Sequence, residues 1–228
     1  MCGRYTQTAG LDVLRDRFLL DQVPAEVLPR YNIAPGQDAP VVLTRKARCL
    51  EALRWGLIPG WAKNPAIGSR LINARCETAL EKPAFRQALE RRRCLVPADG
   101  FYEWKGVGRA KLPFRFHRRD KEPFAFAGIW DAWKDPEGPE LRTFAILTTE
   151  ANSSVRPVHP RMPVILYPED EAAWLDAAAT PEDLLDGLAP YPPDALTAYP
   201  VSRRLNSAQN DDRSLIEPVA DPQPEFDL

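Results

Sequence analysis

Proline is the residue that most restricts the fold of this chain. The 228 residues include 24 prolines, about twice the share that is usual in globular proteins. Because proline fixes φ and has no amide hydrogen to donate, it interrupts helices and is tolerated at turns, sheet edges and the first turn of a helix. The sequence therefore predicts many turns and short strands and few long helices.

Short apolar segments recur along the chain in the pattern of strands. Residues 41–44 and 49–54 predict a hairpin, and further strands are expected at 94–97, 101–105, 112–117, 124–130, 143–148 and 163–166. Helices are expected from Leu11, capped by Thr8, and at 84–92, 169–178 and 181–188, the last with a capping-box-like start at Thr180. Since strands and helices do not alternate, we expect an α+β fold with a largely antiparallel sheet. Residues 2–217 would form a single domain, and the acidic, proline-containing tail 218–228 would be disordered.

Composition excludes several classes of protein. No apolar run approaches the roughly 20 residues of a membrane span, and the first ten residues lack the layout of a signal peptide, so a cytoplasmic protein is expected. The cysteines are Cys2, Cys49, Cys76 and Cys94, with no CxxC spacing, and the histidines are His117 and His159. This pattern predicts neither a structural metal site nor a disulfide framework.

Charge is distributed unevenly. Residues 1–134 contain 24 Lys and Arg against 14 Asp and Glu, whereas residues 135–228 contain 6 against 18. The basic part indicates an anionic partner, although attraction between the two parts within the fold explains the split equally well. Basic residues cluster at 91–93 and 115–121, and Trp55, Trp61 and Trp104 lie among basic residues, a mixture typical of proteins that bind single-stranded nucleic acid.

Cys2 offers unusual chemistry if Met1 is removed. The new N-terminal residue would carry an α-amine and a thiol on adjacent carbons. Roughly a tenth of an α-amine is neutral at pH 7, against about one lysine side chain in a few thousand. A neutral amine attacks aldehydes to give a Schiff base, and the neighbouring thiol can then close a thiazolidine ring. A cysteine at this position with no chemical role is the alternative.

Three further segments contain candidate site residues. In residues 71–78, strand alternation would place Asn73, Arg75 and Glu77 on one face. In residues 98–105, Glu103 stands among aromatic residues, where burial can raise a carboxyl pKa and suit it to proton transfer. His159, between prolines 157 and 160, could carry protons near neutral pH. Each segment taken alone also fits an ordinary surface or core role.

Taken together, the motifs are more specific. MCGRY at the start, YNIAPGQ, WGLIPGWAK, INARCET, LVPADGFYEWK, TEAN and HPRMPVIL follow one another in this order. The chain thereby resembles the SOS-response-associated peptidase family, also called the abasic-site processing (SRAP) family, over roughly residues 2–216. The resemblance implies an α+β fold around a β-barrel-like core, with a basic groove for single-stranded DNA.

The resemblance also implies roles for residues of this chain. Cys2 would be the nucleophile, Asn73 would hold the N-terminal residue and the sugar, and Glu103 and His159 would act as acid and base. The residues expected to contact or shape the path of DNA are Arg4, Asn32, Pro35, Trp61, Arg75, Trp104, Thr148 and Arg161. Pro160 departs from the family, in which an acidic or amide residue often follows the histidine.

The implied activity is that of an abasic-site sensor, acting without metal or cofactor and as a monomer, at the nucleoid when bound to DNA. Cys2 would form a thiazolidine crosslink to an abasic site in single-stranded DNA and so protect the lesion during replication and SOS repair. Self-removal of Met1 and weak lyase activity through the Schiff base are left open. The alternatives are a cysteine peptidase or N-terminal-nucleophile amidohydrolase, and a non-covalent single-strand-binding module.

Overall fold

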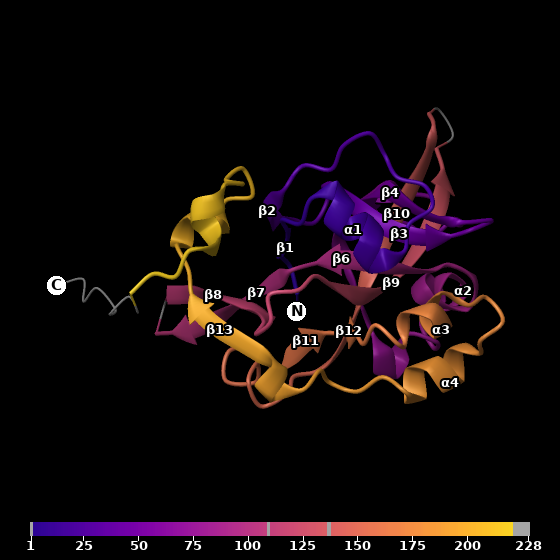
Figure 1. Ribbon diagram of the computed structural model, residues 1–228. Helices are drawn as coiled ribbons and strands as arrows, with labels where there is room; N and C mark the ends of the chain where they lie inside the picture. The colour runs from indigo at the N-terminus through magenta and orange to yellow at the C-terminus, as the bar shows by residue number, and fades with distance from the viewer. Residues whose placement is uncertain (1, 109, 136–137, 221–228) are drawn as a thin grey trace.

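Five strands close into a barrel at the centre of the molecule. The computed structural model describes residues 2–108, 110–135 and 138–220 (Figure 1). In the barrel β3 pairs with β4 and β6, β6 with β9, β9 with β10, and β10 with β4, and only the last pairing is parallel. The barrel strands are β3 (Asp38–Thr44), β4 (Arg48–Trp55), β6 (Arg93–Ala98), β9 (Phe124–Lys134) and β10 (Glu140–Glu150). The predicted α+β fold with a largely antiparallel, barrel-like core is confirmed.

Side-chain alternation along these strands gives the barrel two apolar faces. Residues such as Val41, Val96 and Phe126 point into the barrel and belong to one buried cluster. Their neighbours Val42 and Leu95 belong to a second cluster on the outside, which the helices cover. Burying a large apolar side chain contributes about 1.5–3 kcal/mol, so both faces stabilise the fold. The helices are α1 (Leu11–Phe18), α2 (Pro83–Arg91), α3 (Glu171–Leu175) and α4 (Pro181–Asp186).

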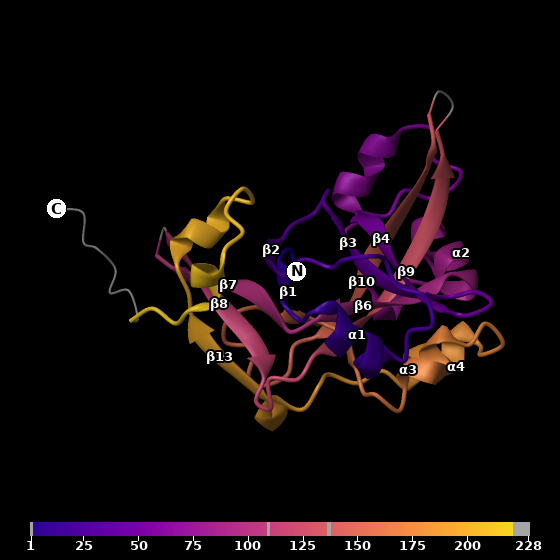
Figure 2. The same ribbon diagram turned by 45° about the horizontal axis from the view of Figure 1, so that its top comes forward.

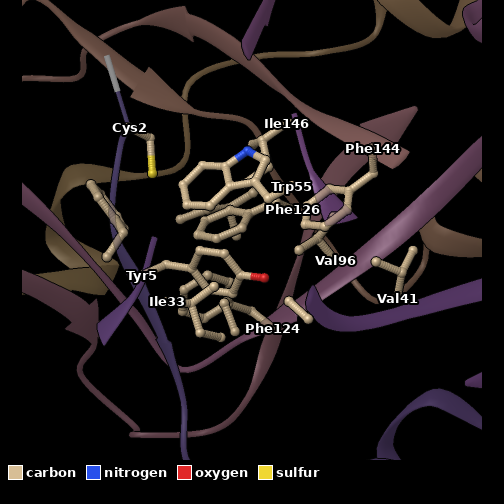
Figure 3. Close-up of a cluster of buried hydrophobic side chains, with 14 of the residues drawn as sticks. Cys2, Tyr5, Ile33, Val41, Trp55, Val96, Phe124, Phe126, Phe144 and Ile146 are labelled. Carbon is tan, nitrogen blue, oxygen red and sulfur yellow. The ribbon is translucent and has the colours of Figure 1, made fainter. Parts of the chain in front are cut away.

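A second sheet lies against one end of the barrel, with strand order β13-β8-β7-β1-β2 (Figure 2). Tyr5, Phe101 and Phe116 of this sheet pack into the inner cluster of the barrel. In Figure 3, Tyr5 and Cys2 lie beside the rings of the inner cluster. The first strand of the chain is thereby placed at the centre of the fold. The strands are β1 (Tyr5–Gln7), β2 (Arg30–Ile33), β7 (Gly100–Val107), β8 (Ala110–Arg118) and β13 (Leu196–Pro200).

Strand β10 brings two of the predicted site segments together. Its last residues pair in parallel with β5 (Asn73–Arg75) and antiparallel with β11 (Arg161–Pro163), and Thr148 is in register with both. The motifs around Asn73 and His159 therefore lie on either side of one strand. The remaining elements are β12 (Ile165–Leu166) and the 3-10 helices η1 (Pro65–Arg70), η2 (Cys76–Thr78), η3 (Pro193–Ala195), η4 (Arg203–Asn206) and η5 (Arg213–Ile216).

Several local expectations were wrong. Thr8 does not cap α1, since Gly10 is the N-cap residue and the Thr8 hydroxyl donates to Asp99 instead. The helix expected at 169–178 ends at Leu175 because the buried Arg93 guanidinium binds the carbonyl oxygens of Trp174 and Asp176. The strand expected at 163–166 is divided between β11 and β12. The Thr180 hydroxyl donates to the Asp183 carboxylate and does not cap the backbone of α4.

The two basic clusters are used mainly inside the fold. Arg93 is only 7% exposed, and Arg92 pairs with Asp131. In the second cluster Arg115 is buried against Asp99 and Arg118 pairs with Asp120. Ion pairs such as Arg17 with Glu171 and Arg30 with Asp211 join the basic and acidic parts of the chain. Part of the charge split is thus neutralised within the fold.

The C-terminal tail lies only partly within the described residues. Of the tail expected to be disordered, residues 221–228 lie outside the described residues, whereas Pro218 and Val219 pair with Val201 and Pro200 at the end of β13. None of the helices in the described residues has the length and hydropathy of a membrane span.

Candidate functional site

The start of the chain is held by hydrogen bonds on both sides. The Asn73 side-chain amide donates to the Cys2 carbonyl oxygen at 2.8 Å, and the Tyr102 amide donates to the Arg4 carbonyl oxygen at 3.0 Å. Cys2 itself has no exposed surface. The Asn73 Oδ1 atom is also buried and, within the described residues, has no hydrogen-bond partner. Because buried polar atoms in proteins are nearly always hydrogen-bonded, this oxygen can accept a hydrogen bond from a further group.

Burial determines the state of the Cys2 thiol. It raises the pKa of this thiol far above the ordinary value, and the negative charge of Glu103 raises it further. The thiol is therefore protonated at neutral pH in the full-length chain. Its proton must leave before or during any nucleophilic attack.

Glu103 is a buried carboxyl on β7. Its side chain is 3% exposed, and burial raises its pKa above the ordinary glutamate value. Strand alternation places it on the same face as Phe101, while Tyr102 points to the other side and packs with Leu205 and Leu215. The predicted aromatic setting and the direction of the pKa shift of Glu103 both fit a proton carrier.

His159 lies opposite Glu103. Its Nδ1 atom is 3.7 Å from Glu103 Oε1, and its side chain is 26% exposed. The same Nδ1 is 3.1 Å from the backbone nitrogen of Arg161 and 3.0 Å from the Arg161 carbonyl oxygen. When protonated, Nδ1 faces two acceptors, and when unprotonated it accepts from the Arg161 amide. Both tautomers therefore have a partner, which suits a residue that exchanges protons.

The loop that carries His159 is fixed by Arg161. The Arg161 guanidinium forks onto the Glu77 carboxylate at 2.6 and 2.9 Å and donates to the Thr148 carbonyl oxygen at 2.6 Å. Glu77 lies in η2, so the expectation that it shares a strand face with Asn73 and Arg75 was wrong. The chain turns after Arg75, and this turn is what directs Glu77 to Arg161.

A cavity opens beside the Glu103–His159 pair. It has a volume of about 450 Å³ and is lined by Glu103, Trp104, Lys111, His159 and Asn206. Lys111 and Asn206 were missed by the sequence analysis. No sequence signal marks Asn206, which arrives from the far end of the chain and accepts a hydrogen bond from the Trp104 indole at 2.8 Å. Trp104 and Glu103 were predicted site residues and meet here.

The other predicted DNA residues fall into two groups. Trp61 is 57% exposed and, with Lys63 and Arg70, lines a separate hollow of about 360 Å³, and Arg75 is exposed at the end of β5. Pro35 is half-buried in a turn before Gly36, whose φ is +85°. These residues are placed where a strand of DNA could reach them.

The second group is engaged within the protein. Asn32 is fully buried, and its amide donates to the carbonyl oxygens of Ser207 and Asn210. Thr148 is also fully buried, and its hydroxyl contacts Arg161. Both side chains hold neighbouring segments in place and offer no surface to DNA. Arg4 is half-buried and reaches the Asn206 carbonyl oxygen at 3.5 Å.

The described part of the chain offers no evident metal position. Within residues 2–108, 110–135 and 138–220, no group of three or more His, Cys, Asp or Glu side chains is arranged to hold a metal ion. The four cysteines are free thiols. The titratable groups gathered at the site are the Cys2 thiol and the Glu103–His159 pair.

Comparison with known sequences shows the family of this chain. Residues 1–208 match the family described as SOS response associated peptidase (SRAP). The abasic site processing protein YoqW of Bacillus subtilis is 44% identical over 222 residues, which cover 95% of this chain and 99% of that protein. The abasic site processing protein YedK of Escherichia coli is 32% identical over 96% of this chain and 100% of its own length. In Gallus gallus, the abasic site processing protein HMCES is 34% identical over 96% of this chain and 78% of its own.

A solved structure shows the same fold. The crystal structure of a protein from Bacteroides thetaiotaomicron superposes with a TM-score of 0.88 and 28% sequence identity, covering 96% of this chain and 100% of that one. The overall fold of this chain is therefore shared with that protein.

Proposed function

Because this chain belongs to the SOS response associated peptidase (SRAP) family, we propose that it processes abasic sites in DNA by bonding to them covalently through Cys2. The observation that carries the proposal is the position of Cys2 at the start of the N-terminal strand. The charge of Glu103 acts on the Cys2 thiol, and the Asn73 side-chain amide donates a hydrogen bond to the Cys2 carbonyl oxygen. The curated relatives that it matches are themselves named abasic site processing proteins.

Met1 must leave before the reaction begins. The Cys2 nitrogen becomes a free amine only when the peptide bond that joins it to Met1 is hydrolysed, whether by this protein or by an aminopeptidase. The peptidase name of the family fits self-removal of Met1.

The first bond joins nitrogen to the sugar. The abasic deoxyribose enters the cavity beside Glu103 and His159, and His159 protonates the ring oxygen as the ring opens to the aldehyde. The neutral Cys2 amine attacks C1′ to give a carbinolamine. Glu103, whose pKa is raised by burial, protonates the hydroxyl group, which leaves as water and gives the Schiff base.

The second bond joins sulfur to the same carbon. The Cys2 sulfur attacks C1′, the nitrogen regains its electron pair, and the thiol proton passes to the Glu103 carboxylate. The net reaction converts an aldehyde and an aminothiol into a thiazolidine and one water. The unpartnered Oδ1 of Asn73 is available to accept a hydrogen bond from the Cys2 amine or from the sugar. β-Elimination from the Schiff base would give a weak lyase activity.

Single-stranded DNA fits the surroundings of the site. Trp61 offers an exposed ring for base stacking, and Arg75 is an exposed cation beside Asn73. The proposed reacting groups all come from one chain, so a monomer suffices. Bound in this way at the nucleoid, the protein would shield the lesion during replication and SOS repair.

The proposal is tested by asking whether the protein forms a covalent product with an abasic strand and not with an intact one. Wild-type protein is incubated with matched single strands, one intact and one with a single abasic site, and resolved on a denaturing gel. A shifted band with the abasic strand alone supports the proposal. No shifted band on the denaturing gel, with equal binding of both strands on a native gel, would leave a simple binding module. Turnover of amide substrates in place of crosslinking would indicate a peptidase.

A further inference from the structure

The proposed nucleophile is the end of a chain, and chain ends fray unless they are tied down. After the loss of Met1, Cys2, Gly3 and Arg4 precede the first residue of β1, a strand of three residues. We propose that Asp99 is a positioning residue that holds this strand in place and thereby presents Cys2 to its substrate. This inference rests on the proposed function.

Asp99 binds β1 and the residue after it through its side-chain carboxylate and its backbone amide. Its Oδ1 accepts from the Thr6 hydroxyl at 2.5 Å, and its Oδ2 accepts from the Thr8 amide at 2.5 Å and from the Thr8 hydroxyl at 2.6 Å. Its own amide donates to the Thr6 carbonyl oxygen at 2.9 Å. Hydrogen bonds to an ionised acceptor are about twice as strong as neutral ones, so this carboxylate adds to the backbone pairing that β1 makes with β2 and β7.

Arg115 forms an ion pair with the Asp99 carboxylate. Its Nη2 atom lies 3.2 Å from both Oδ1 and the carbonyl oxygen of Asp99, and the two side chains are only 9% and 10% exposed. The guanidinium lies so close to Gly100 that a Cβ there would meet it at 2.8–2.9 Å. A side chain at position 100 would therefore displace the Arg115 guanidinium from this packing.

The clamp formed by Asp99, Thr6, Thr8 and Arg115 is separate from the reacting groups. Asp99 and Arg115 line a cavity of about 750 Å³ that includes neither Glu103 nor His159. Arg115 pairs in register with Tyr102, whose side chain points away from the face of Glu103. The clamp thus acts on the reaction through the backbone of β1 and not by touching DNA.

The expected effect is on reaction and not on binding. Loosening β1 lowers the fraction of molecules in which Cys2 is in place, and the observed rate falls with that fraction. We expect Asp99→Asn to lower the crosslinking rate at saturating abasic single-stranded DNA by about tenfold. The Kd for the intact strand stays within about twofold, because the phosphate and stacking contacts are unchanged.

The control is a second ion pair with a buried carboxylate, between Glu171 and Arg17 at 2.6 Å, which ties α3 to α1. Glu171→Gln removes a buried charge of the same kind and should leave the crosslinking rate unchanged. Thr8→Val, which removes one hydrogen bond of the clamp and keeps the backbone amide, gives a smaller loss than Asp99→Asn. Removal of Met1 is checked by intact mass in every variant.

Hydrogen exchange reports on the clamp directly. In Asp99→Asn the amides of residues 5–8 should exchange faster while those of β9 and β10 stay protected. Equal saturating rates for wild type and Asp99→Asn, or equal losses in Asp99→Asn and Glu171→Gln, would overturn the inference. If wild type forms no crosslink at all, the proposed function fails first, so the two failures are distinguishable.

Discussion

His159 Nδ1 lies 3.7 Å from Oε1 of Glu103, although the two residues are 56 positions apart in the chain. The pair joins a buried carboxyl to a partly exposed imidazole at the edge of a single cavity. A proton can therefore pass between a group that faces Cys2 and a group that reaches solvent. This arrangement suits a reaction that must first release water from a carbinolamine and then accept a thiol proton.

Replacing Glu103 by glutamine tests its role in proton transfer. The amide keeps the shape of the side chain and cannot exchange a proton, so we expect the crosslinking rate to fall by about 10²-fold. The measurement is the single-turnover rate at saturating abasic strand. The exposed residue Glu150 provides the matched control, and equal rates for Glu103→Gln and Glu150→Gln would remove Glu103 from the chemistry.

The same variant should be more stable than wild type at neutral pH. Burial raises the pKa of Glu103, so the folded state favours the protonated carboxyl. Below the ordinary glutamate value of 4.5 both states are protonated and the two proteins unfold alike. As pH rises through the raised pKa, wild type loses free energy of unfolding and the glutamine variant does not. Thermal unfolding at pH 4 and pH 8 measures this difference, and a variant less stable at pH 8 would contradict it.

Asn73→Ala removes the hydrogen bond to the Cys2 carbonyl oxygen. The substitution also removes Oδ1, the proposed acceptor for the Cys2 amine or the sugar. Together these two losses should slow crosslinking about tenfold. Affinity for intact single strands should not change, since Asn73 is expected to contact the N-terminal residue and the sugar and not the phosphates. A fall in affinity with an unchanged rate would assign Asn73 to binding instead.

Glu77→Gln separates DNA affinity from reaction rate. Without the Glu77 carboxylate, the Arg161 guanidinium is released to bind a DNA phosphate. The affinity of the variant for single-stranded DNA should therefore be about threefold higher than that of wild type, and it should decrease more steeply as the salt concentration increases. The loop of His159 loses its anchor, so the saturating rate should fall. Glu81→Gln makes the same change in net charge with no contact to Arg161. Identical behaviour of the two variants would show that Arg161 does not take part in binding.

Trp61→Ala tests base stacking. The indole is 57% exposed, so its removal should cost little stability. Stacking on an aromatic side chain contributes about 1–3 kcal/mol per base, which predicts at least a fivefold loss of affinity for single strands. Leu28, which is 63% exposed, provides the control for loss of an exposed apolar side chain. Fluorescence anisotropy with a labelled strand measures both variants.

The sequence predicted best where periodicity and local chemistry decide the structure. Alternation along 101–105 placed Glu103 on one face and Tyr102 on the other, as observed. The strands expected at 112–117, 124–130 and 143–148 are present and longer, because pairing in the sheets extends them past their apolar centres. Local pattern is sufficient here because burial on one face requires it.

Long-range contacts could not be predicted in this way. No periodicity indicates that Arg93 would take the carbonyl oxygens at the end of α3, or that Thr8 would bind Asp99 and not cap a helix. The arrival of Asn206 at Trp104 likewise depends on the path of the whole chain. In each case a buried polar group takes the partner that the tertiary structure brings near, and local propensity is overruled.

The mass of the crosslinked product tests the central claim most directly. Wild-type protein purified from cells is mixed with a single strand that contains one abasic site, and the intact adduct is weighed and then mapped by peptide fragmentation. We predict the mass of the chain without Met1 plus that of the DNA less one water, located on Cys2, and no stable adduct from Cys2→Ala. An adduct that retains Met1, or an equal yield from Cys2→Ala, would contradict it.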